Sequence, residues 1–360
     1  MGSFWKNKKV LITGNTGFKG SWLSIWLKEL GAEVYGYSLS PETKPNMFSA
    51  CGLEKEINSM ISDISNFDSL KKYIKKIRPE IIYHMAAQPL VIESYINPYN
   101  TLVTNVQGTF NILECLRNLN YSHTFINVTT DKVYENNDSD ISYKEEDKLG
   151  GNDIYSASKA CSDLVTKSYR KSFYDKCDMN INISTARSGN VIGGGDWSEN
   201  RLIPDIVRAV ANNESLEIRN PDATRPWQHV LEPLYGYILL AESMHSNNEF
   251  SSAWNFGPND NQEKTVEEVA ASLLKMYKRQ DLYRRSPSKS KYKESKLLKL
   301  NCKKSERKLS WRSILTINEC LELTYSWYSA FYNSENVYTL TKNQIKSYIG
   351  KVNESNKNKI

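Results

Sequence analysis

Apolar and polar residues follow two different periodicities along the first half of the chain. Short apolar runs, typical of buried strands, lie at residues 8–13, 33–38, 57–62, 80–86, 124–130 and 181–187. Between them, apolar residues recur at helical spacing near residues 22–30, 67–77, 98–118 and 154–175. This alternation predicts an α/β fold, a Rossmann-type doubly wound parallel sheet with helices on both faces.

The regular alternation ends near residue 190. Beyond it glycine, proline and tryptophan are more frequent, and single strands such as residues 253–257 lie between helices. We therefore expect two parts, a dinucleotide-binding domain (residues 1–189 with about 229–254) and a smaller mixed lobe (about 190–228 and 255–335). Residues 336–360, which end in KVNESNKNKI, are expected to form a polar C-terminal tail.

The charge of the chain is unevenly distributed. The formal net charge is +6, yet residues 284–308 alone hold eleven lysines and arginines against two glutamates. A nucleic-acid-binding segment would interleave such a run with stacking aromatic residues, and this run has only Tyr292. We therefore expect a solvated, partly helical surface of the smaller lobe, and no nucleic-acid partner.

Composition argues against several other classes of protein. The chain has no apolar run of membrane-spanning length and no basic-plus-apolar leader, so we expect a soluble cytoplasmic protein without a membrane partner. The six cysteines are scattered, and none of the four histidines stands at ligand spacing from a cysteine. We therefore expect neither a disulfide framework nor a metal site.

A glycine-rich segment follows the first predicted strand and opens the first predicted helix. It runs Gly14-Asn-Thr-Gly17-Phe-Lys-Gly20. Free N–H groups and the helix dipole favour a diphosphate at such a place, and glycines remove the side chains that would block its approach. The alternative is an ordinary tight turn. We expect a dinucleotide to bind at Gly14, Thr16, Gly17, Phe18 and Gly20.

A tyrosine and a lysine stand four residues apart in the helix that follows the fifth strand. This spacing puts Tyr155 and Lys159 on one helical face. The lysine ammonium, together with the positive charge of an oxidised nicotinamide, should stabilise the phenolate and lower the pKa of Tyr155. The tyrosine can then accept a proton from a substrate hydroxyl while a hydride leaves for the cofactor.

The fifth strand ends in an acid and a base. Its apolar run stops at Thr130-Asp131-Lys132. These side chains could merely be solvated in a surface loop. We prefer an active-site interpretation, in which Asp131 donates and Lys132 accepts a proton. As a base Lys132 must be neutral, which requires its pKa to fall by roughly 3 units, and a charged Lys132 could only stabilise an enolate.

The spacing of the glycine segment, together with Tyr155 and Lys159, resembles the extended short-chain dehydrogenase/reductase family. Further segments resemble its sugar-nucleotide dehydratase branch, in particular the CDP-glucose 4,6-dehydratases: HMAAQPLV (84–91), TNVQGT (104–109), ARSGNVIGGGDWSENRLIPD (186–205), RPWQHVLEPL (225–234) and AWNFGP (253–258). Dehydratases of this branch usually carry Thr-Asp-Glu where this chain has Thr-Asp-Lys. Epimerases of the branch have small hydroxyl residues there.

The resemblance implies the remaining site residues and an NAD cofactor. Asp63 would contact the adenine beside Ile64, Ala86 and Ala87 would pass beside the cofactor, and Asn105 would brace the active-site helix. Arg225 would bind the substrate diphosphate, and the nucleotide-sugar cleft would be lined by Gln88, Asn190, Arg201 and Asn255. The helices near 98–118 and 154–175 pair subunits in this family, which implies a homodimer or homotetramer.

The residues leave alternatives for the cofactor, the substrate and the role of the two tryptophans. The second strand ends Tyr37-Ser38-Leu39-Ser40, without an acid for a ribose 2′-hydroxyl, so the residues alone do not distinguish NAD from NADP. Ile92 stands where an arginine is expected in the family, which leaves the nucleotide and the hexose uncertain. Trp197 and Trp227 either flank the base or fill the smaller lobe, and His84 is expected to pack at a strand end.

The expected reaction is the 4,6-dehydration of CDP-D-glucose. Tyr155 takes the O4 proton, Thr130 binds the C4 oxygen, Lys132 takes the C5 proton, and Asp131 protonates the leaving C6 hydroxyl. The alternatives are a 4,6-dehydratase of a UDP-N-acetylhexosamine or a GDP-sugar, a 4-epimerase, and a non-catalytic protein that only senses the cofactor.

Overall fold

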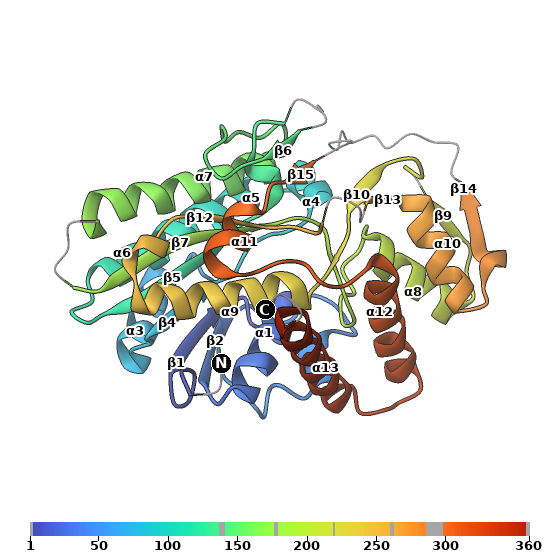
Figure 1. The fold of residues 1–360 in the computed structure, drawn as a ribbon, viewed down its shortest axis with the longest axis horizontal. Coiled ribbons are helices and arrows are strands. Elements are labelled where there is room, and N and C mark those ends of the chain that lie inside the picture. The colour runs from blue at the N-terminus through green and yellow to red at the C-terminus, as the bar shows by residue number, and fades with distance from the viewer. Residues whose placement is uncertain are drawn as a thin grey trace.

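The computed structural model of the 360-residue chain describes residues 3–136, 141–175, 179–218, 220–259, 263–285 and 298–357. A sheet of seven parallel strands forms its centre (Figure 1), with the strand order β12-β7-β5-β4-β1-β2-β3. The strands are β1 (Lys9–Thr13), β2 (Glu33–Ser38), β3 (Asn58–Ile61), β4 (Ile81–His84), β5 (His123–Val128), β7 (Ile181–Ser188) and β12 (Ala253–Phe256). The predicted fold class and all six predicted strands of the first half are confirmed.

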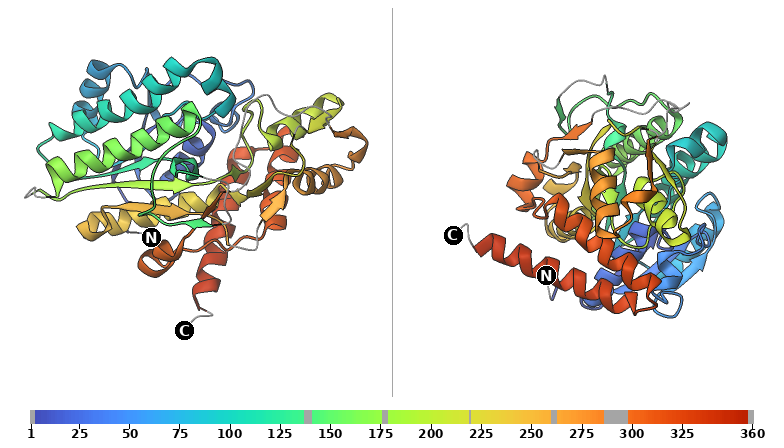
Figure 2. Two further views of the ribbon diagram at one scale, coloured as in Figure 1. Left: turned by 90° about the horizontal axis from the view of Figure 1, so that it is seen from above. Right: turned by 90° about the vertical axis from the view of Figure 1, so that its right-hand side faces the viewer.

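Helices cover both faces of the sheet (Figure 2). Successive strand residues point to opposite faces, so Val10 and Ile12 of β1 join one buried cluster and Leu11 joins another. Helices α1 (Phe18–Glu29) and α9 (Leu231–Ser246) pack on the first face. Helices α3 (Phe67–Ile77), α6 (Gly108–Arg117) and α7 (Ile154–Tyr169) pack on the second. The chain reverses direction across the sheet between β1 and β4, and ligands of such sheets bind at the carboxyl ends of the strands there.

The helix expected near 98–118 is divided into three parts. Helix α5 (Pro98–Leu102) leads into a π-helical turn, η1 (Val103–Gln107), which leads into α6. A second π-helical turn, η3 (Arg170–Tyr174), extends α7. Apolar spacing does not distinguish an α-turn from a π-turn, so the sequence did not indicate these changes. Such turns are frequent at functional sites.

The smaller lobe lies at one end of the sheet, on the right of Figure 1. It is built from α8 (Leu202–Asn212), β9 (Leu216–Ile218), β10 (Thr224–Pro226), β13 (Glu263–Thr265), α10 (Val266–Met276), β14 (Tyr283–Arg285) and α12 (Ile317–Tyr332). Strands β10 and β13 pair antiparallel, whereas β9 and β14 pair parallel. Within it Trp197 packs on Trp327, and Trp227 is buried and donates to the Lys264 carbonyl oxygen, 3.0 Å away. Both tryptophans therefore fill the protein interior.

Short elements connect the larger ones. They are α2 (Met47–Ala50), α4 (Val91–Ile96), β6 (Ser142–Tyr143), β8 (Val191–Ile192), β11 (Gln228–His229), β15 (Lys299–Leu300), α11 (Lys303–Leu309), and the 3₁₀ turns η2 (Asp131–Val133), η4 (Asn248–Phe250) and η5 (Gln280–Leu282). Of the basic run 284–308, residues 286–297 lie outside the described residues, and α11 supplies its helical part. Among the described helices, none is both long and apolar enough to cross a membrane.

The expected lobe boundary at residue 255 needs correction. Asn255 and Phe256 still belong to β12 of the main sheet. Ser305 of α11 donates to the Asn255 carbonyl oxygen, 2.5 Å away, and Trp311 donates from Nε1 to the carbonyl oxygen of Glu232 in α9, 3.0 Å away. The segment around α11 therefore packs on the larger domain, through long-range contacts that the sequence pattern did not reveal.

The expected polar tail is wrong. Residues Val337–Lys357 form a helix, α13, which lies beside α1 and α12. Ile345 and Tyr348 are almost fully buried, and the Tyr348 hydroxyl donates to Glu232 Oε2 over 2.8 Å. Polar residues cover the outer face of this helix, so its low average hydrophobicity concealed an apolar stripe.

Candidate active site

The glycine loop between β1 and α1 has the geometry of a diphosphate cradle. Gly14 has a φ of +75°, in the left-handed region, and a Cβ there would lie 2.7 Å from the Ala86 nitrogen. A Cβ at Gly20 would lie 2.2 Å from the Gly14 carbonyl oxygen. Gly17 caps α1 without a side-chain hydrogen bond. The first N–H groups of α1 therefore have no side-chain acceptor at the cap, which fits a dinucleotide diphosphate.

The other predicted cofactor residues follow the same edge of the sheet. Thr16 Oγ1 lies 2.7 Å from Ser38 Oγ at the end of β2 and donates to the Leu39 carbonyl oxygen at 2.8 Å. Asp63 is exposed after β3 and accepts from the Ser65 N–H, 2.7 Å away. Of the remaining predicted cofactor residues, Ile64 is buried, Phe18, Ala86 and Ala87 are half-buried, and Gly17 is exposed.

Asn105 lies in the π-helical turn η1 and links two parts of the site. Its amide nitrogen donates to Ser158 Oγ of α7 at 2.9 Å and to the Gln88 carbonyl oxygen at 3.1 Å. Its Oδ1 accepts from the Gln88 N–H at 2.8 Å. Asn105 thus contacts α7, the helix that it was predicted to brace. His84 is buried between Thr13 and Thr109.

Tyr155 and Lys159 project from the first two turns of α7. Asp153 starts this helix by accepting from the Ser156 N–H at 2.9 Å. Tyr155 is only 8% exposed. Burial raises the pKa of Tyr155 to about 12, although a hydrogen bond to Thr130 and the charge of Arg201 act in the opposite direction.

The expected lowering of the Tyr155 pKa depends on the positive charge of an oxidised nicotinamide as well as on Lys159, so it stays a prediction. The Lys159 ammonium donates to the carbonyl oxygen of Val128, 2.9 Å away. Burial, followed by repulsion from Lys19, lowers the pKa of Lys159 to about 8. For Tyr155, burial outweighs the Thr130 hydrogen bond and the Arg201 charge, which both favour the phenolate. The charge of an oxidised nicotinamide would act in the same direction as these two.

Asp131 is a buried acid beside this pair. Thr130 Oγ1 donates to Asp131 Oδ1 at 3.0 Å, and a Cβ at Gly189 would lie 2.7 Å from Asp131 Oδ2. Burial raises the pKa of Asp131, while the charges of Lys132 and Arg225 partly oppose this. The half-buried Lys132 follows directly in η2. A carboxyl group with a raised pKa is suited to hold a proton and donate it.

The predicted substrate residues divide into two groups. Arg201, at the start of α8, donates to Asp196 Oδ2 at 2.8 Å, and its charge acts on Tyr155. The charge of the half-buried Arg225 acts on Asp131. Asn190 is half-buried just beyond β7. These three side chains lie on the segments that enclose the catalytic residues.

Two further predicted substrate residues, Gln88 and Asn255, have side chains that are bonded within the protein. The amide of Gln88 is used within its own loop, with contacts to Leu90 and to Thr101 Oγ1. Asn255 is fully buried, where its amide accepts from the Tyr134 hydroxyl and donates to the carbonyl oxygens of Tyr143 and Asn301. These bonds tie both side chains to the protein itself, and their assignment to the substrate stays a prediction.

The sequence did not indicate three residues that the fold brings to this site. Lys19 of the glycine loop donates to Ser188 Oγ and to the Tyr237 hydroxyl, each at 3.0 Å. Those two hydroxyls lie 2.8 Å apart. A lysine between the glycines of a phosphate-binding loop was the available signal, but its contacts come from β7 and α9, far along the chain.

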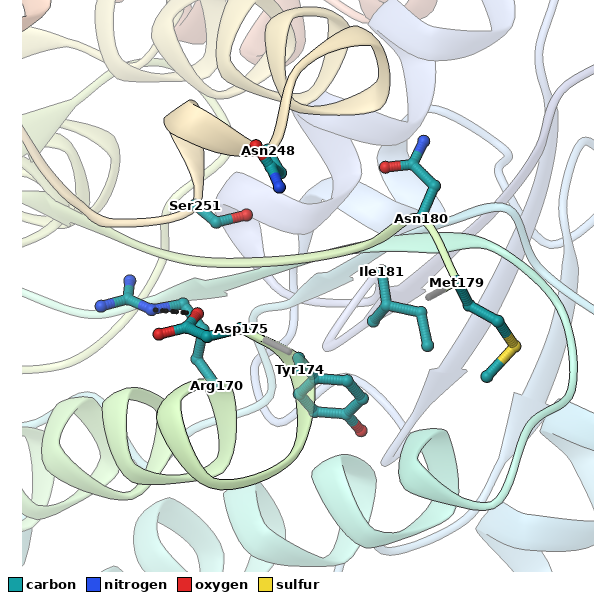
Figure 3. A pocket seen from close by; sticks show the side chains of 8 residues that line it. All are labelled: Arg170, Tyr174, Asp175, Met179, Asn180, Ile181, Asn248 and Ser251. Atoms are coloured by element: carbon teal, nitrogen blue, oxygen red, sulfur yellow. Dashed lines mark ion pairs between the residues drawn. The ribbon is translucent and has the colours of Figure 1, made fainter. Parts of the chain in front are cut away.

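Two cavities lie away from the catalytic residues. One, of about 280 Å³, is lined by Arg170, Asp175, Met179, Asn180 and neighbouring residues, and holds an Arg170–Asp175 ion pair at 3.8 Å (Figure 3). It lies at the amino-terminal end of β7. Another, of about 450 Å³, lies near Glu145, Lys167 and Lys304. Ligands of parallel α/β sheets bind at the carboxyl ends of the strands, where Tyr155 and Asp131 meet.

Comparison with known proteins agrees with this geometry. Residues 11–324 match the family model described as GDP-mannose 4,6 dehydratase. The chain belongs to this family of sugar-nucleotide dehydratases. A CDP-glucose 4,6-dehydratase from Salmonella typhimurium is 41% identical over 351 residues, which are 96% of this chain and 98% of that protein. Helix α13 lies beyond the matched range of the family model.

Solved structures of dehydratases and epimerases share the fold. The epimerase Mth375 from Methanothermobacter thermautotrophicus has a TM-score of 0.77 at 24% identity and covers 91% of this chain and 94% of its own. The dTDP-glucose 4,6-dehydratase DesIV from Streptomyces venezuelae, with NAD and TYD bound, has a TM-score of 0.76 at 23% identity, covering 91% of this chain and 99% of its own. At these identities the likeness concerns the fold alone.

Proposed function

We propose that this protein is an NAD-dependent sugar-nucleotide 4,6-dehydratase that converts CDP-D-glucose to CDP-4-keto-6-deoxy-D-glucose and water. The observation that carries the proposal is the buried acid Asp131, with its raised pKa, beside Tyr155 and Lys159 at the edge of the glycine loop. The 41% identity to a CDP-glucose 4,6-dehydratase supports CDP-glucose as the substrate.

The glycine loop, Asp63 and the Ala86–Ala87 segment would hold NAD, which supplies a hydride acceptor for C4 and a hydride donor for C6. Tyr155 accepts the proton of the C4 hydroxyl, and the charge of Arg201 and a hydrogen bond to Thr130 favour its phenolate. Thr130, which contacts both Tyr155 and Asp131, is in a position to bind the C4 oxygen.

The elimination of water requires two further groups. Asp131 gives its proton to the departing C6 hydroxyl, since burial keeps that carboxyl protonated to higher pH. Lys132, next in the chain, takes the C5 proton if its amine is neutral. If the amine is charged, it stabilises the enolate instead. An epimerase would need neither group.

The substrate diphosphate would be bound by two arginines. Arg225 and Arg201 carry planar guanidinium groups that suit phosphate oxygens, and both act electrostatically on the catalytic residues. Asn190 would contact the sugar or the diphosphate from the end of β7. Ile92 lies in α4, close to the same edge, and is the first residue to test if the nucleotide or the hexose differs.

The decisive experiment is mass spectrometry of separate reactions with CDP-glucose, UDP-glucose, dTDP-glucose, GDP-mannose and UDP-N-acetylglucosamine in the presence of NAD. We expect CDP-glucose to lose one water without accumulation of NADH. Loss of water from another sugar would retain the reaction and change the substrate. A change of configuration without loss of water would indicate a 4-epimerase, and the absence of turnover would support a cofactor-sensing protein.

The quaternary structure is proposed to be a homodimer or homotetramer formed through α5, α6 and α7 with its extension η3. Large apolar side chains remain exposed along these helices: Tyr99 (81%), Phe173 (48%), Leu164 (46%) and Phe110 (41%). We expect Phe110→Glu to shift the mass of the particle in light scattering toward that of the monomer. Phe110→Tyr is the matched control, and an unchanged mass for Phe110→Glu would contradict pairing through this face.

A further inference from the structure

The backbone of Tyr155 is bonded to a residue from another helix. Its N–H donates to the hydroxyl oxygen of Ser94 in α4, 3.2 Å away. Ser94 is fully buried, and its own hydroxyl donates to the Val91 carbonyl oxygen at 2.7 Å. Ser94 and Tyr155 lie 61 positions apart in the chain, so the fold alone brings them together. The first turn of α7 is thus fastened to α4 at the residue proposed to accept the C4 proton.

The start of α7 explains why this bond matters. The first four N–H groups of a helix have no acceptor within the helix. The N-cap residue Asp153 accepts from the Ser156 N–H at 2.9 Å and from the Ser156 hydroxyl at 2.6 Å. The N–H of Tyr155 is bonded instead to Ser94. The cap therefore fixes the start of the helix, while Ser94 fixes the backbone of Tyr155 itself.

The carbonyl oxygen of Tyr155 is bonded as well. Ser158 Oγ donates to it at 2.7 Å, and the amide of Asn105 donates to Ser158 Oγ at 2.9 Å. Asn105 also exchanges two hydrogen bonds with the backbone of Gln88, in the loop that leads to α4. The N–H and the carbonyl oxygen of Tyr155 are therefore both tied to the segment between Gln88 and Ser94.

We propose that Ser94 is a positioning residue, which holds the Tyr155 phenol in line with the C4 hydroxyl of the sugar. A helical side chain has few rotamers, so the place of its backbone decides where its end lies. Proton transfer needs the two oxygens to be about 2.6–3.2 Å apart. A misplacement of about 1 Å can cost about 100-fold in rate. Because Ser94 is fully buried, it acts through Tyr155 and not on the sugar.

This inference rests on the proposed function, in which Tyr155 accepts the C4 proton while a hydride passes to NAD. It concerns only this oxidation step. Loss of the Ser94 hydroxyl should slow oxidation at C4 and leave the binding of the sugar nucleotide nearly unchanged, because Arg201 and Arg225 are proposed to bind the diphosphate from other segments. A loss of rate without a loss of binding separates positioning from substrate recognition.

The test measures bound NADH by stopped-flow absorbance after mixing the full chain and NAD with CDP-glucose. It uses the Asp131→Asn background, where the reaction should stop after oxidation at C4. Addition of Ser94→Ala should lower the rate of NADH formation about tenfold. The CDP-glucose concentration that gives half the maximal rate should change less than about twofold. If no NADH forms in this background, the same comparison is made on the dehydration rate of the chain that retains Asp131, with the same expectation.

Ser94→Thr is the matched variant, because threonine retains a hydroxyl that can bond a carbonyl oxygen one turn earlier. It should restore most of the rate. Thr324→Val in α12 is the control for loss of a buried hydroxyl elsewhere, since Thr324 Oγ1 donates to the Cys320 carbonyl oxygen at 2.7 Å. It should leave NADH formation unchanged. Equal slowing by Ser94→Ala and Thr324→Val would indicate a general effect on the fold and overturn the proposal, as would a Ser94→Thr chain as slow as Ser94→Ala.

Hydrogen exchange followed by mass spectrometry tests the contact without substrate or cofactor. Ser94→Ala should speed the exchange of one amide in the peptide that contains Tyr155, and Ser94→Thr should not. Unchanged exchange in Ser94→Ala would overturn the proposal. If the natural chain oxidised no sugar nucleotide, the proposed function would fail and this inference with it, whereas normal oxidation in Ser94→Ala would overturn the inference alone.

Discussion

Helix α7 and the strands beside it carry two groups of buried charged residues. In one group the charges are paired with each other, and in the other their hydrogen-bond partners are neutral. Arg187 of β7 donates to Asp163 of α7 through two nitrogens, at 2.8 and 2.9 Å, and also contacts the Tyr134 hydroxyl. These two charged side chains are only 3% and 2% exposed. One turn earlier on α7, Lys159 has a backbone carbonyl as its hydrogen-bond partner, and Asp131 has the Thr130 hydroxyl.

The two groups serve different purposes: the Arg187–Asp163 pair stabilises the fold, whereas Lys159 and Asp131 are proposed to take part in catalysis. Although burial works against the charge of Arg187, pairing with Asp163 raises the pKa of this guanidinium, so it stays charged. In the catalytic group burial prevails, lowers the pKa of Lys159 to about 8 and raises the pKa of Asp131. Groups whose pKa values are shifted towards neutrality by burial lower the stability of the fold but are useful in catalysis. Four experiments can test this comparison.

The largest effect is expected for Asp131→Asn. Loss of a general acid typically costs about 10²–10⁴-fold in rate, so the dehydration rate should fall by that factor. Oxidation at C4 does not need this acid, so bound NADH should still appear in absorbance after mixing with CDP-glucose. A variant that still releases water at the natural rate would refute the role of Asp131 and favour the 4-epimerase alternative.

Asp163→Asn should act on stability rather than on chemistry. It leaves the Arg187 charge buried without its partner, which typically costs about 3–5 kcal/mol. Urea unfolding should show this loss. The double variant Asp163→Leu with Arg187→Met is the control, since it removes both charges and should recover much of the stability. If Asp163→Asn were as stable as the natural protein, the pair would not be structural.

The pH dependence of stability should differ between the two groups. The pKa of Asp131 is raised in the folded state, so the unfolded chain ionises first, and this residue reduces stability as pH rises from the unfolded value through the folded one. Asp131→Asn should therefore gain stability relative to the natural protein as pH rises over this interval. Thermal unfolding at several pH values measures the difference, and the opposite slope would contradict the raised pKa.

The smallest effect is expected for Tyr348→Phe in α13. Glu232 is a third buried carboxyl, and it accepts from Tyr348 and from the N–H groups of Ile314 and Leu315. Neutral donors satisfy it, so we place it with the structural groups. Loss of one hydrogen bond should cost about 1 kcal/mol in denaturant unfolding and leave turnover unchanged. A fall in turnover without loss of stability would move Glu232 to the catalytic group.

Local features of the sequence predicted most of the sheet and part of the site. Glycines 14, 17 and 20, the Tyr155–Lys159 spacing and the strand that stops at Asp131 are each set by neighbouring residues, and the structure has all of them at one edge of the sheet. Gln88 and Asn255 were assigned to the substrate because their segments resemble the family. In the structure their amides are bonded to protein groups, some of them far along the chain, so their assignment to the substrate stays a prediction.

The sequence by itself determined the order of strands and helices, the glycine cradle and the residue types available for acid–base chemistry, because periodicity and turn chemistry act over a few residues. Only the tertiary structure decided which charged groups were paired with each other and which had their pKa values shifted by burial. It placed Lys19 against Ser188 and Tyr237, buried one face of α13, and joined Asp163 to Arg187. A pKa shift depends on burial and on charges from distant segments, and those exist only once the chain has folded.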